Sequence, residues 1–171
     1  MKPRTLIVLT TGGTIEKTYD EGDGSLENRD TILEREVCKR LRLPYTYLQV
    51  IPIMCKDSLY MTPEDRIVIA RQVRSHLIYG HPIVIIHGTD TMAVTAEYLQ
   101  EAIPALTVPI VLTGAMRPVG MHDSDAFQNV AEAFMAAQIA RPGVYISFHN
   151  QLFPAGQVQK NKQRLTFEWK D

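Results

Sequence analysis

Cysteine, net charge and long apolar runs are all scarce in this chain, and each scarcity excludes a class of protein. Two cysteines, Cys38 and Cys55, are too few among 171 residues for a disulfide scaffold, so we expect two reduced thiols. A net charge of −1 produces no strong field, which disfavours nucleic acid and membrane surfaces as partners. The apolar run Leu6–Leu9 is too short for a signal peptide, and no run approaches the length of a membrane span. We therefore expect a cytoplasmic protein.

Several common site signatures are also missing. The two neighbouring glycines Gly12 and Gly13 have neither the further glycines of a dinucleotide loop nor the lysine of a phosphate loop. No serine has the surroundings of a nucleophile elbow, and neither cysteine resembles a catalytic thiol. The five histidines have no convincing metal-ligand spacing; they are His76, His81, His87, His122 and His149. We expect neither a metal nor a cofactor.

Short runs of branched apolar residues are present, and they alternate with segments of helical spacing. The runs are Leu6–Leu9, Val50–Ile53, Ile83–Ile86, Pro109–Leu112 and Val144–Phe148. Helical spacing lies within residues 33–41, 62–77, 92–103 and 127–137. Strands that alternate with helices and are uniformly apolar predict an α/β fold, an open and mainly parallel sheet with helices on both faces. We expect residues 1–171 to form a single domain.

The clearest helix start is at Thr62, where Pro63 suits the first turn and Asp65 stands in the capping-box position. Asp30 is a weaker N-cap candidate for the first helix. Before it, residues 16–30 are polar and glycine-bearing, with no apolar period. This pattern predicts a surface loop, and a loop of this length is often a functional lid.

Four polar segments follow strands of the predicted sheet: Thr11–Thr14, Lys56–Ser58, Gly88–Thr91 and Thr113–Pro118. Because ligands of open parallel sheets bind where strands end and helices begin, we expect all four to line one crevice. Each segment also has a plain structural explanation. The glycine pair suits an ordinary turn, Asp57 and Ser58 are common turn residues, and Gly88–Thr91 suits a helix cap. Together, the hydroxyls and carboxylates favour attack by a hydroxyl on a small polar substrate.

These segments resemble the signatures of the bacterial-type L-asparaginases. The similar segments follow one another in the order of the family signatures. They are Thr11–Ile15, then Asp57–Ser58 with Met61–Asp65, then His87–Met92, then Thr113–Pro118 with Ser124–Ala126 and Asn129. The resemblance implies hydrolysis of L-asparagine to L-aspartate and ammonia, with glutamine as a second substrate in some members, and no cofactor or metal. The implied small-molecule substrate leaves no role for nucleic acid or a membrane.

The resemblance also implies roles for single residues, and we expect a threonine nucleophile and an acyl-enzyme. The catalytic candidates are Thr14, Tyr19, Thr89, Asp90 and Lys160, and the substrate-binding candidates are Asp57, Ser58, Gly88, Asp90 and Ala115. Lys162 is a rival for Lys160, and the residues leave open which threonine attacks first. A threonine hydroxyl needs a neighbouring base, and a lysine serves as one when its surroundings lower its pKa to about 7–8.

Common family members have a second, C-terminal domain, so the chain resembles a short member. We expect a homo-oligomer in which another copy replaces the missing wall. One alternative is a non-catalytic, amino-acid-binding or regulatory domain. Another is the amidase subunit of a tRNA-dependent amidotransferase, which the near-neutral charge disfavours.

Overall fold

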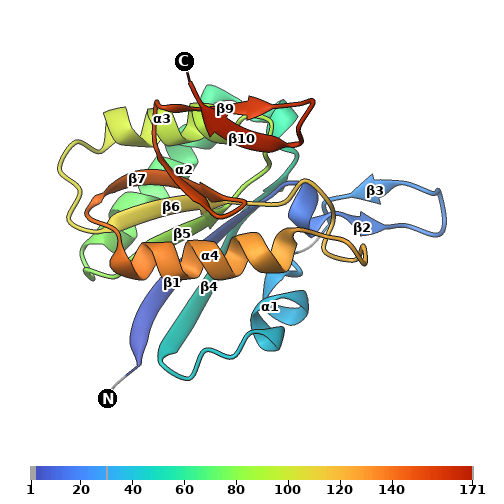
Figure 1. The fold of residues 1–171 in the computed structure, drawn as a ribbon, viewed down its shortest axis with the longest axis horizontal. Helices are drawn as coiled ribbons and strands as arrows, with labels where there is room; N and C mark the ends of the chain where they lie inside the picture. Colours follow the sequence, from blue (N-terminus) through green and yellow to red (C-terminus); the bar gives the residue numbers. More distant parts are fainter. Residues whose placement is uncertain (1–2, 30, 171) are drawn as a thin grey trace.

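A six-stranded sheet forms the centre of the computed structural model, which describes residues 3–29 and 31–170 (Figure 1). Its strands lie in the order β4-β1-β5-β6-β7-β8. They are β1 (Arg4–Gly12), β4 (Thr46–Lys56), β5 (Ile83–Ile86), β6 (Pro109–Thr113), β7 (Gly143–Phe148) and β8 (Gln151–Pro154). The first five are parallel to their neighbours, with Ile7 of β1 opposite both Gln49 of β4 and Ile83 of β5. Their carboxyl ends therefore meet at one edge of the sheet.

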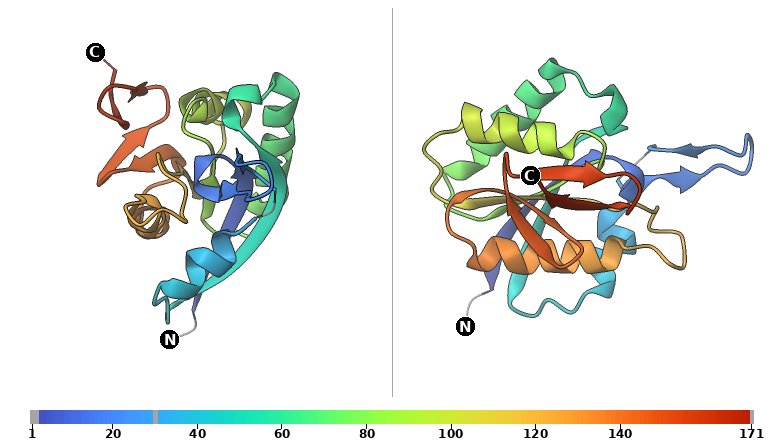
Figure 2. Two further views of the ribbon diagram at one scale, coloured as in Figure 1. Left: turned by 90° about the vertical axis from the view of Figure 1, so that its right-hand side faces the viewer. Right: turned by 45° about the horizontal axis from the view of Figure 1, so that its top comes forward.

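Helices cover both faces of the sheet, as the alternation of strands and helices predicts. Helices α2 (Pro63–Leu77) and α3 (Met92–Ala102) lie on one face, and α4 (Ala126–Ile139) lies on the other with the short α1 (Leu33–Glu36) (Figure 2). Alternate residues of β5 enter the two cores: Ile83 and Ile85 pack with α2 and α3, while Val84 and Ile86 pack with α1 and α4. The predicted fold class, an open and mainly parallel α/β sheet, is confirmed.

Two predicted helix starts have different outcomes. Thr62 caps α2 as predicted, with its hydroxyl accepting from the Asp65 N–H and the Asp65 carboxylate accepting from the Thr62 N–H. The helical pattern at 33–41 is wrong in extent, because α1 ends at Glu36 and a 3-10 turn over Cys38–Arg40 replaces its continuation. The β-branched Val37 lies between them, fully buried, so packing of this turn outweighs the helical period. Asp30 lies outside the described residues.

Two features at the end of the chain are not evident in the sequence pattern. Strand β8 turns back antiparallel to β7. A separate hairpin then follows, formed by β9 (Val158–Asn161) and β10 (Thr166–Trp169), and Lys160 of β9 lies opposite Phe167 of β10. Val158 and Phe167 are buried in the core on the α3 side of the sheet, which holds this hairpin over the body of the protein.

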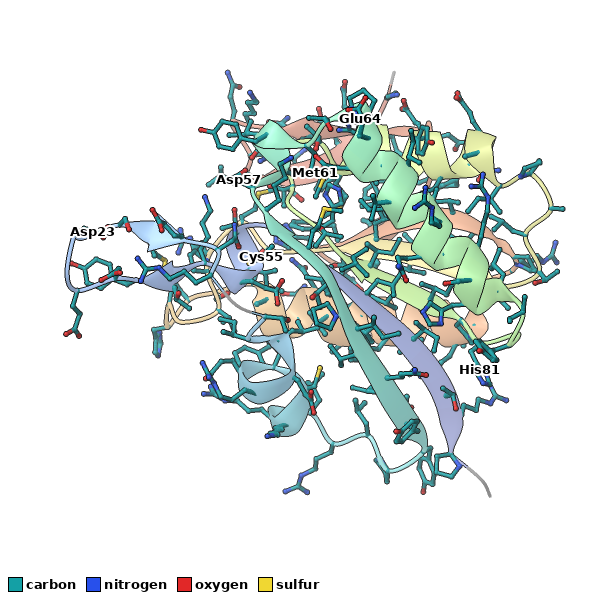
Figure 3. The ribbon with its side chains drawn as sticks, turned by 180° about the vertical axis from the view of Figure 1, so that it is seen from behind. Asp23, Cys55, Asp57, Met61, Glu64 and His81 are labelled. Atoms are coloured by element: carbon teal, nitrogen blue, oxygen red, sulfur yellow. The ribbon has the colours of Figure 1, made fainter. Side chains whose placement is uncertain are left out.

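A second hairpin projects away from the body (Figure 1). It consists of β2 (Thr18–Tyr19) and β3 (Leu26–Glu27), which are antiparallel. Figure 3 shows Asp23 at its tip, far from Asp57 at the end of β4. This hairpin occupies the segment in which the sequence predicts a loop. Among the described residues, no helix is both long and apolar enough to cross a bilayer.

Candidate active site

Close approaches at three glycines bring three of the four polar segments together. A methyl group placed on Gly13 would lie 2.4 Å from the Gly88 nitrogen, and one on Gly88 would lie 2.5 Å from the Ser58 hydroxyl oxygen. Likewise, a methyl on Gly12 would lie 2.5 Å from the Lys56 nitrogen. Gly12 and Gly13 also have φ values of +96° and +87°, which L side chains rarely adopt. The strand ends therefore approach as closely as backbones allow.

The fourth segment joins through His87. A methyl on Gly114 would lie 2.2 Å from the His87 carbonyl oxygen, and the His87 N–H donates to the Thr113 carbonyl at 2.8 Å. The His87 ring is completely buried. Its Nδ1 lies 2.7 Å from the Gly88 carbonyl oxygen and its Nε2 lies 2.9 Å from the Thr95 hydroxyl, so Nδ1 donates and Nε2 accepts. Burial lowers the pKa of His87 to about 4, although the Gly88 carbonyl opposes this shift.

The principal polar contact of the site links Lys160 to the segment after β5. The Lys160 ammonium donates to the Thr89 hydroxyl at 2.7 Å and to Asp90 Oδ1 at 2.8 Å. Thr89 is buried, with 2% of its surface exposed, and Lys160 is largely covered. Lys162, the rival candidate, is exposed. Thus three of the predicted catalytic residues form one hydrogen-bonded cluster, although seventy residues separate Lys160 from Asp90.

Asp57 and Ser58 lie where β4 ends, in a 3-10 turn over Ser58–Tyr60 that the Asp57 side chain caps (Figure 3). Asp57 forms an ion pair with Lys17 at 2.7 Å. Partial burial works against ionisation of the Asp57 carboxyl, but the hydrogen bonds from Lys17 and the Leu59 N–H and the charges of Lys17 and Lys160 lower its pKa below the usual value. Asp57 is therefore an anion that already faces two cations.

Ser58 is fully buried, and its hydroxyl has no hydrogen-bond partner among the residues that the structure describes. Its carbonyl accepts from the Thr91 hydroxyl at 2.8 Å, so the backbone of this turn is fixed while the side chain stays available. Because an unpaired buried hydroxyl costs about 1–3 kcal/mol, this group is suited to hydrogen-bond a ligand.

Thr14 begins a 3-10 turn over Thr14–Glu16, directly after the two glycines. The buried Glu16 carboxylate stabilises this turn, because it accepts hydrogen bonds from the Gly12 N–H at 3.1 Å and from the Thr31 hydroxyl. Burial raises the pKa of Glu16, while hydrogen bonds from Thr31 and from backbone N–H groups oppose the rise. Thr14 is thus carried on the turn whose Gly13 backbone touches Gly88.

Tyr19 stands apart from this cluster. It lies on the projecting hairpin, with 65% of its surface exposed. Together with Leu26, Ile32 and Val119 it lines a cavity of about 480 Å³ beneath the hairpin, whose lining does not include Thr14 or Thr89. The catalytic role predicted for Tyr19 therefore requires a different position of the hairpin.

Ala115, the remaining substrate-binding candidate, is buried just after β6 and packs against the core on the α4 side. The sequence did not point to Lys17 or Glu16, although both touch the site. Each is a charged residue within or beside a polar loop, and only the fold reveals that one faces Asp57 and the other supports Gly12.

Known proteins share this arrangement of the chain. Residues 5–167 match the family model described as "Asparaginase, N-terminal". L-asparaginase of Thermococcus kodakarensis is 35% identical over 156 residues, which are 91% of this chain and 47% of that protein. A glutamyl-tRNA(Gln) amidotransferase component from Methanococcus vannielii is 32% identical over 152 residues, which are 87% of this chain and 35% of that protein.

A solved structure agrees with the fold. The thermostable L-asparaginase from Thermococcus kodakarensis superposes with a TM-score of 0.85 and 32% identity, covering 96% of this chain and 51% of the other. This chain therefore spans about half the length of the asparaginases that it matches.

Proposed function

The chain belongs to the asparaginase family, and we propose on this basis that it hydrolyses the side-chain amide of L-asparagine to L-aspartate and ammonia. The observation that carries the proposal is the contact of Lys160 with Thr89 and Asp90, at 2.7 and 2.8 Å. It lies beside the turn that bears Thr14, because the backbones of Gly13 and Gly88 touch. Two hydroxyls, an amine and a carboxylate at one sheet edge suit acyl transfer from a small amide.

The proposed reaction has two steps. The Thr14 hydroxyl oxygen adds to the amide carbon, the carbon–nitrogen bond breaks, and the hydroxyl proton leaves with the nitrogen as ammonia. Water then cleaves the threonine ester and releases aspartate, which restores the hydroxyl. Lys160 and Thr89 lie at hydrogen-bonding distance from each other, so they are suited to carry a proton to the departing nitrogen in the first step and from the entering water in the second.

Binding of the substrate is assigned to groups that carry the right charge or lack a partner. Asp57 and Asp90 suit the α-ammonium group, and the unpaired Ser58 hydroxyl suits the α-carboxylate. Backbone groups near Gly88 and Ala115 would contact the amide. A backbone donor aimed at the oxyanion of the tetrahedral intermediate contributes roughly 3–4 kcal/mol in other enzymes.

Closure and assembly complete the proposal. The hairpin that carries Tyr19 would fold over the bound substrate and exclude water. A second copy of the chain would supply a further wall, which makes the working unit a homo-oligomer. Cys38 is a buried thiol outside any disulfide, burial and the neighbouring Glu34 raise its pKa to about 11, and a reduced thiol of this kind suits the proposed cytoplasmic location.

A coupled ammonia assay with asparagine and glutamine side by side tests the proposal. Wild type should release ammonia from asparagine at the same rate with and without EDTA. Thr14→Val and Thr89→Val should each lose activity sharply, because valine keeps the shape of threonine without its hydroxyl. Thr107→Val, at an exposed position before β6, is the matched control and should keep activity.

The lysine assignment has its own pair of variants. Lys160→Met should lower kcat by about a hundredfold or more, as loss of a general acid–base group does elsewhere. Lys162 lies two residues further along the chain and is exposed, so Lys162→Met removes the same charge from the surface and should leave kcat unchanged. Equal kcat values for Lys160→Met and wild type would contradict the assignment.

Two other results would redirect the proposal. Calorimetric binding of asparagine or aspartate without ammonia release, even after prolonged assay, would identify an amino-acid-binding domain. Release from glutamine in preference to asparagine would favour an amide-donor role like that of the amidotransferase relative.

A further inference from the structure

The turn between β7 and β8 places a histidine in an unfavourable backbone conformation. His149 has φ +44° and the following Asn150 has φ +62°, so both residues of this two-residue turn are left-handed. Glycine and asparagine are the usual residues of such turns, and other L residues pay roughly 1–2 kcal/mol there. Asn150 is a usual choice and His149 is not. Contacts of its side chain must therefore offset the cost.

The His149 ring bridges two side chains that are distant in sequence. Its Nε2 lies 3.0 Å from Asp125 Oδ2, and its Nδ1 lies 2.9 Å from the Thr166 hydroxyl. A carboxylate only accepts, so Nε2 donates to Asp125 and Nδ1 pairs with Thr166. The ring thus joins the start of α4 to strand β10.

Asp125 extends this connection to the loop after β6. Its carboxylate accepts from the backbone N–H groups of Met116 at 3.0 Å and Arg117 at 3.1 Å. Asn129, which is fully buried, donates to the same carboxylate at 2.8 Å and accepts from the His149 N–H at 3.1 Å. One end of the connection is therefore rigid, and it adjoins Ala115.

The other end reaches the hairpin that carries Lys160. Thr166 precedes Phe167, and Phe167 lies directly opposite Lys160 in the β9–β10 pair. The hairpin also packs through Phe167 on Phe148, with ring centroids 5.0 Å apart, and through an exposed ion pair of Lys170 with Glu97. Apolar packing is not directional and exposed ion pairs are weak, so the hydrogen bonds of His149 supply the directional contact that the rest of this packing lacks.

We propose that His149 is a positioning residue: through Asp125 and Thr166 it fixes the β9–β10 hairpin relative to the loop after β6, and so places the Lys160 amine on Thr89. The inference rests on the proposed function for its effect on turnover. Loss of the bridge lets the hairpin shift by a fraction of an ångström. This shift displaces the Lys160 amine and leaves substrate binding intact. Displacement of a reacting group by about 1 Å costs up to a hundredfold in rate.

The sharpest test compares two glycine substitutions in the same turn. His149→Gly relieves the backbone cost and removes the bridge, whereas Asn150→Gly changes the same turn and leaves the bridge in place. Because relief of the backbone cost offsets the lost contacts, His149→Gly should unfold near the denaturant midpoint of wild type, as should Asn150→Gly. His149→Gly should lower kcat ten- to a hundredfold with KM within about twofold, while Asn150→Gly should retain the kcat of wild type.

Rescue experiments separate positioning from general damage. Removal of the ring extends a cavity of about 170 Å³ that it lines with Met116 and Asp125. Free imidazole should therefore restore part of the lost kcat of His149→Gly. Thr166→Val, which has the same shape without the hydroxyl, should reproduce the loss, and Thr166→Ser should not.

Hydrogen exchange of residues 158–169 supplies a readout that needs no activity. It should be faster in His149→Gly and Thr166→Val than in wild type, and unchanged in Asn150→Gly. If wild type releases no ammonia, the proposed function fails, and exchange alone then decides whether the bridge holds the hairpin. Wild-type exchange of the hairpin in His149→Gly, or a wild-type kcat in that variant, would overturn the inference.

Discussion

The centre of the site is the place where the turns at Gly13, Ser58 and Gly88 meet. The β2–β3 hairpin follows the first of these turns in sequence and is built in the opposite way. At the centre, glycine backbones from separate strand ends touch. The side chains of His87, Glu16 and Ser58 are buried around them. The hairpin tip is held by its own turn, in which the Asp20 N–H donates to the Ser25 carbonyl and Asp20 Oδ1 accepts from the Gly22 N–H. Its large side chains, Tyr19 and Leu26, are 65% and 42% exposed.

A rigid region and a loosely held one can divide the work of a single site. Close backbone contacts fix Thr14 and Thr89 at little entropic cost during catalysis, because folding has already ordered them. A segment with exposed hydrogen bonds and few buried contacts opens locally at low free energy, as lids do. We therefore expect changes at the centre to cost stability and changes on the hairpin to alter turnover.

The largest effect should separate two glycines of similar backbone conformation. Gly13→Ala places a methyl 2.5 Å from the Gly88 Cα and should destabilise the fold by about 3 kcal/mol or more. Gly24→Ala, at φ +74° on the hairpin, meets nothing closer than the Tyr19 hydroxyl at 3.8 Å and should cost about 1 kcal/mol. Urea unfolding measures both. Similar losses for the two variants would remove the distinction between the regions.

Acid should destabilise the centre through His87. Its pKa is lowered from 6.5 to about 4, so the unfolded chain binds a proton that the folded chain rejects. The stability contribution is present above pH 6.5 and is lost as the pH falls towards 4, by about 3 kcal/mol in total. Denaturant unfolding at pH 7 and pH 4.5 should show a smaller loss in His87→Gln than in wild type. His122→Asn, at an exposed position, is the control and should follow wild type.

The Tyr19 hydroxyl should affect turnover without affecting stability. Tyr19→Phe removes only the hydroxyl of a mostly exposed side chain, so the free energy of unfolding should change by less than about 0.5 kcal/mol. If Tyr19 is catalytic, as the family resemblance implies, loss of its hydroxyl should lower kcat about tenfold. Tyr47→Phe, an exposed tyrosine on β4, is the matched control. An unchanged kcat in Tyr19→Phe would remove the hairpin from the reaction.

The smallest effect concerns the ion pair between the two regions. Lys17, just before β2, holds Asp57, and a substrate ammonium group must compete with it. A partly exposed pair of this kind is worth about 0.2–1 kcal/mol, so Lys17→Met should lower KM by up to about fivefold. Lys17→Arg keeps the competing charge and should keep the KM. A higher KM in Lys17→Met would show that Lys17 helps to hold the substrate instead.

Much of the fold could be predicted because its signals are local. The capping box at Thr62 and Asp65 specifies where α2 begins, and the four β-branched residues Ile83–Ile86 specify a strand buried on both faces. The helix predicted over 33–41 failed because the burial of Val37 decides that turn, and burial is not a local property. Strand β8 and the two small hairpins have no comparable apolar period.

The contacts within the candidate site were predictable only in part. Motif order and the strand-end rule placed Thr14, Asp57 and Thr89 in one predicted crevice, and the structure brings the backbones of their segments together. The contact of Lys160 with Thr89 needed the β9–β10 hairpin, which the sequence pattern did not reveal. The bridge from Asp125 through His149 to Thr166 spans about forty residues, and nothing in the spacing of its members points to it.

Short-range patterns of polarity and turn chemistry specify the alternation of strands and helices and the residue types at the ends of the strands. Which charges face one another depends instead on how the whole chain packs. Lys17 meets Asp57, Lys160 meets Thr89, and His149 meets Thr166, because side chains pair across distances that are set by the packing of the whole sheet.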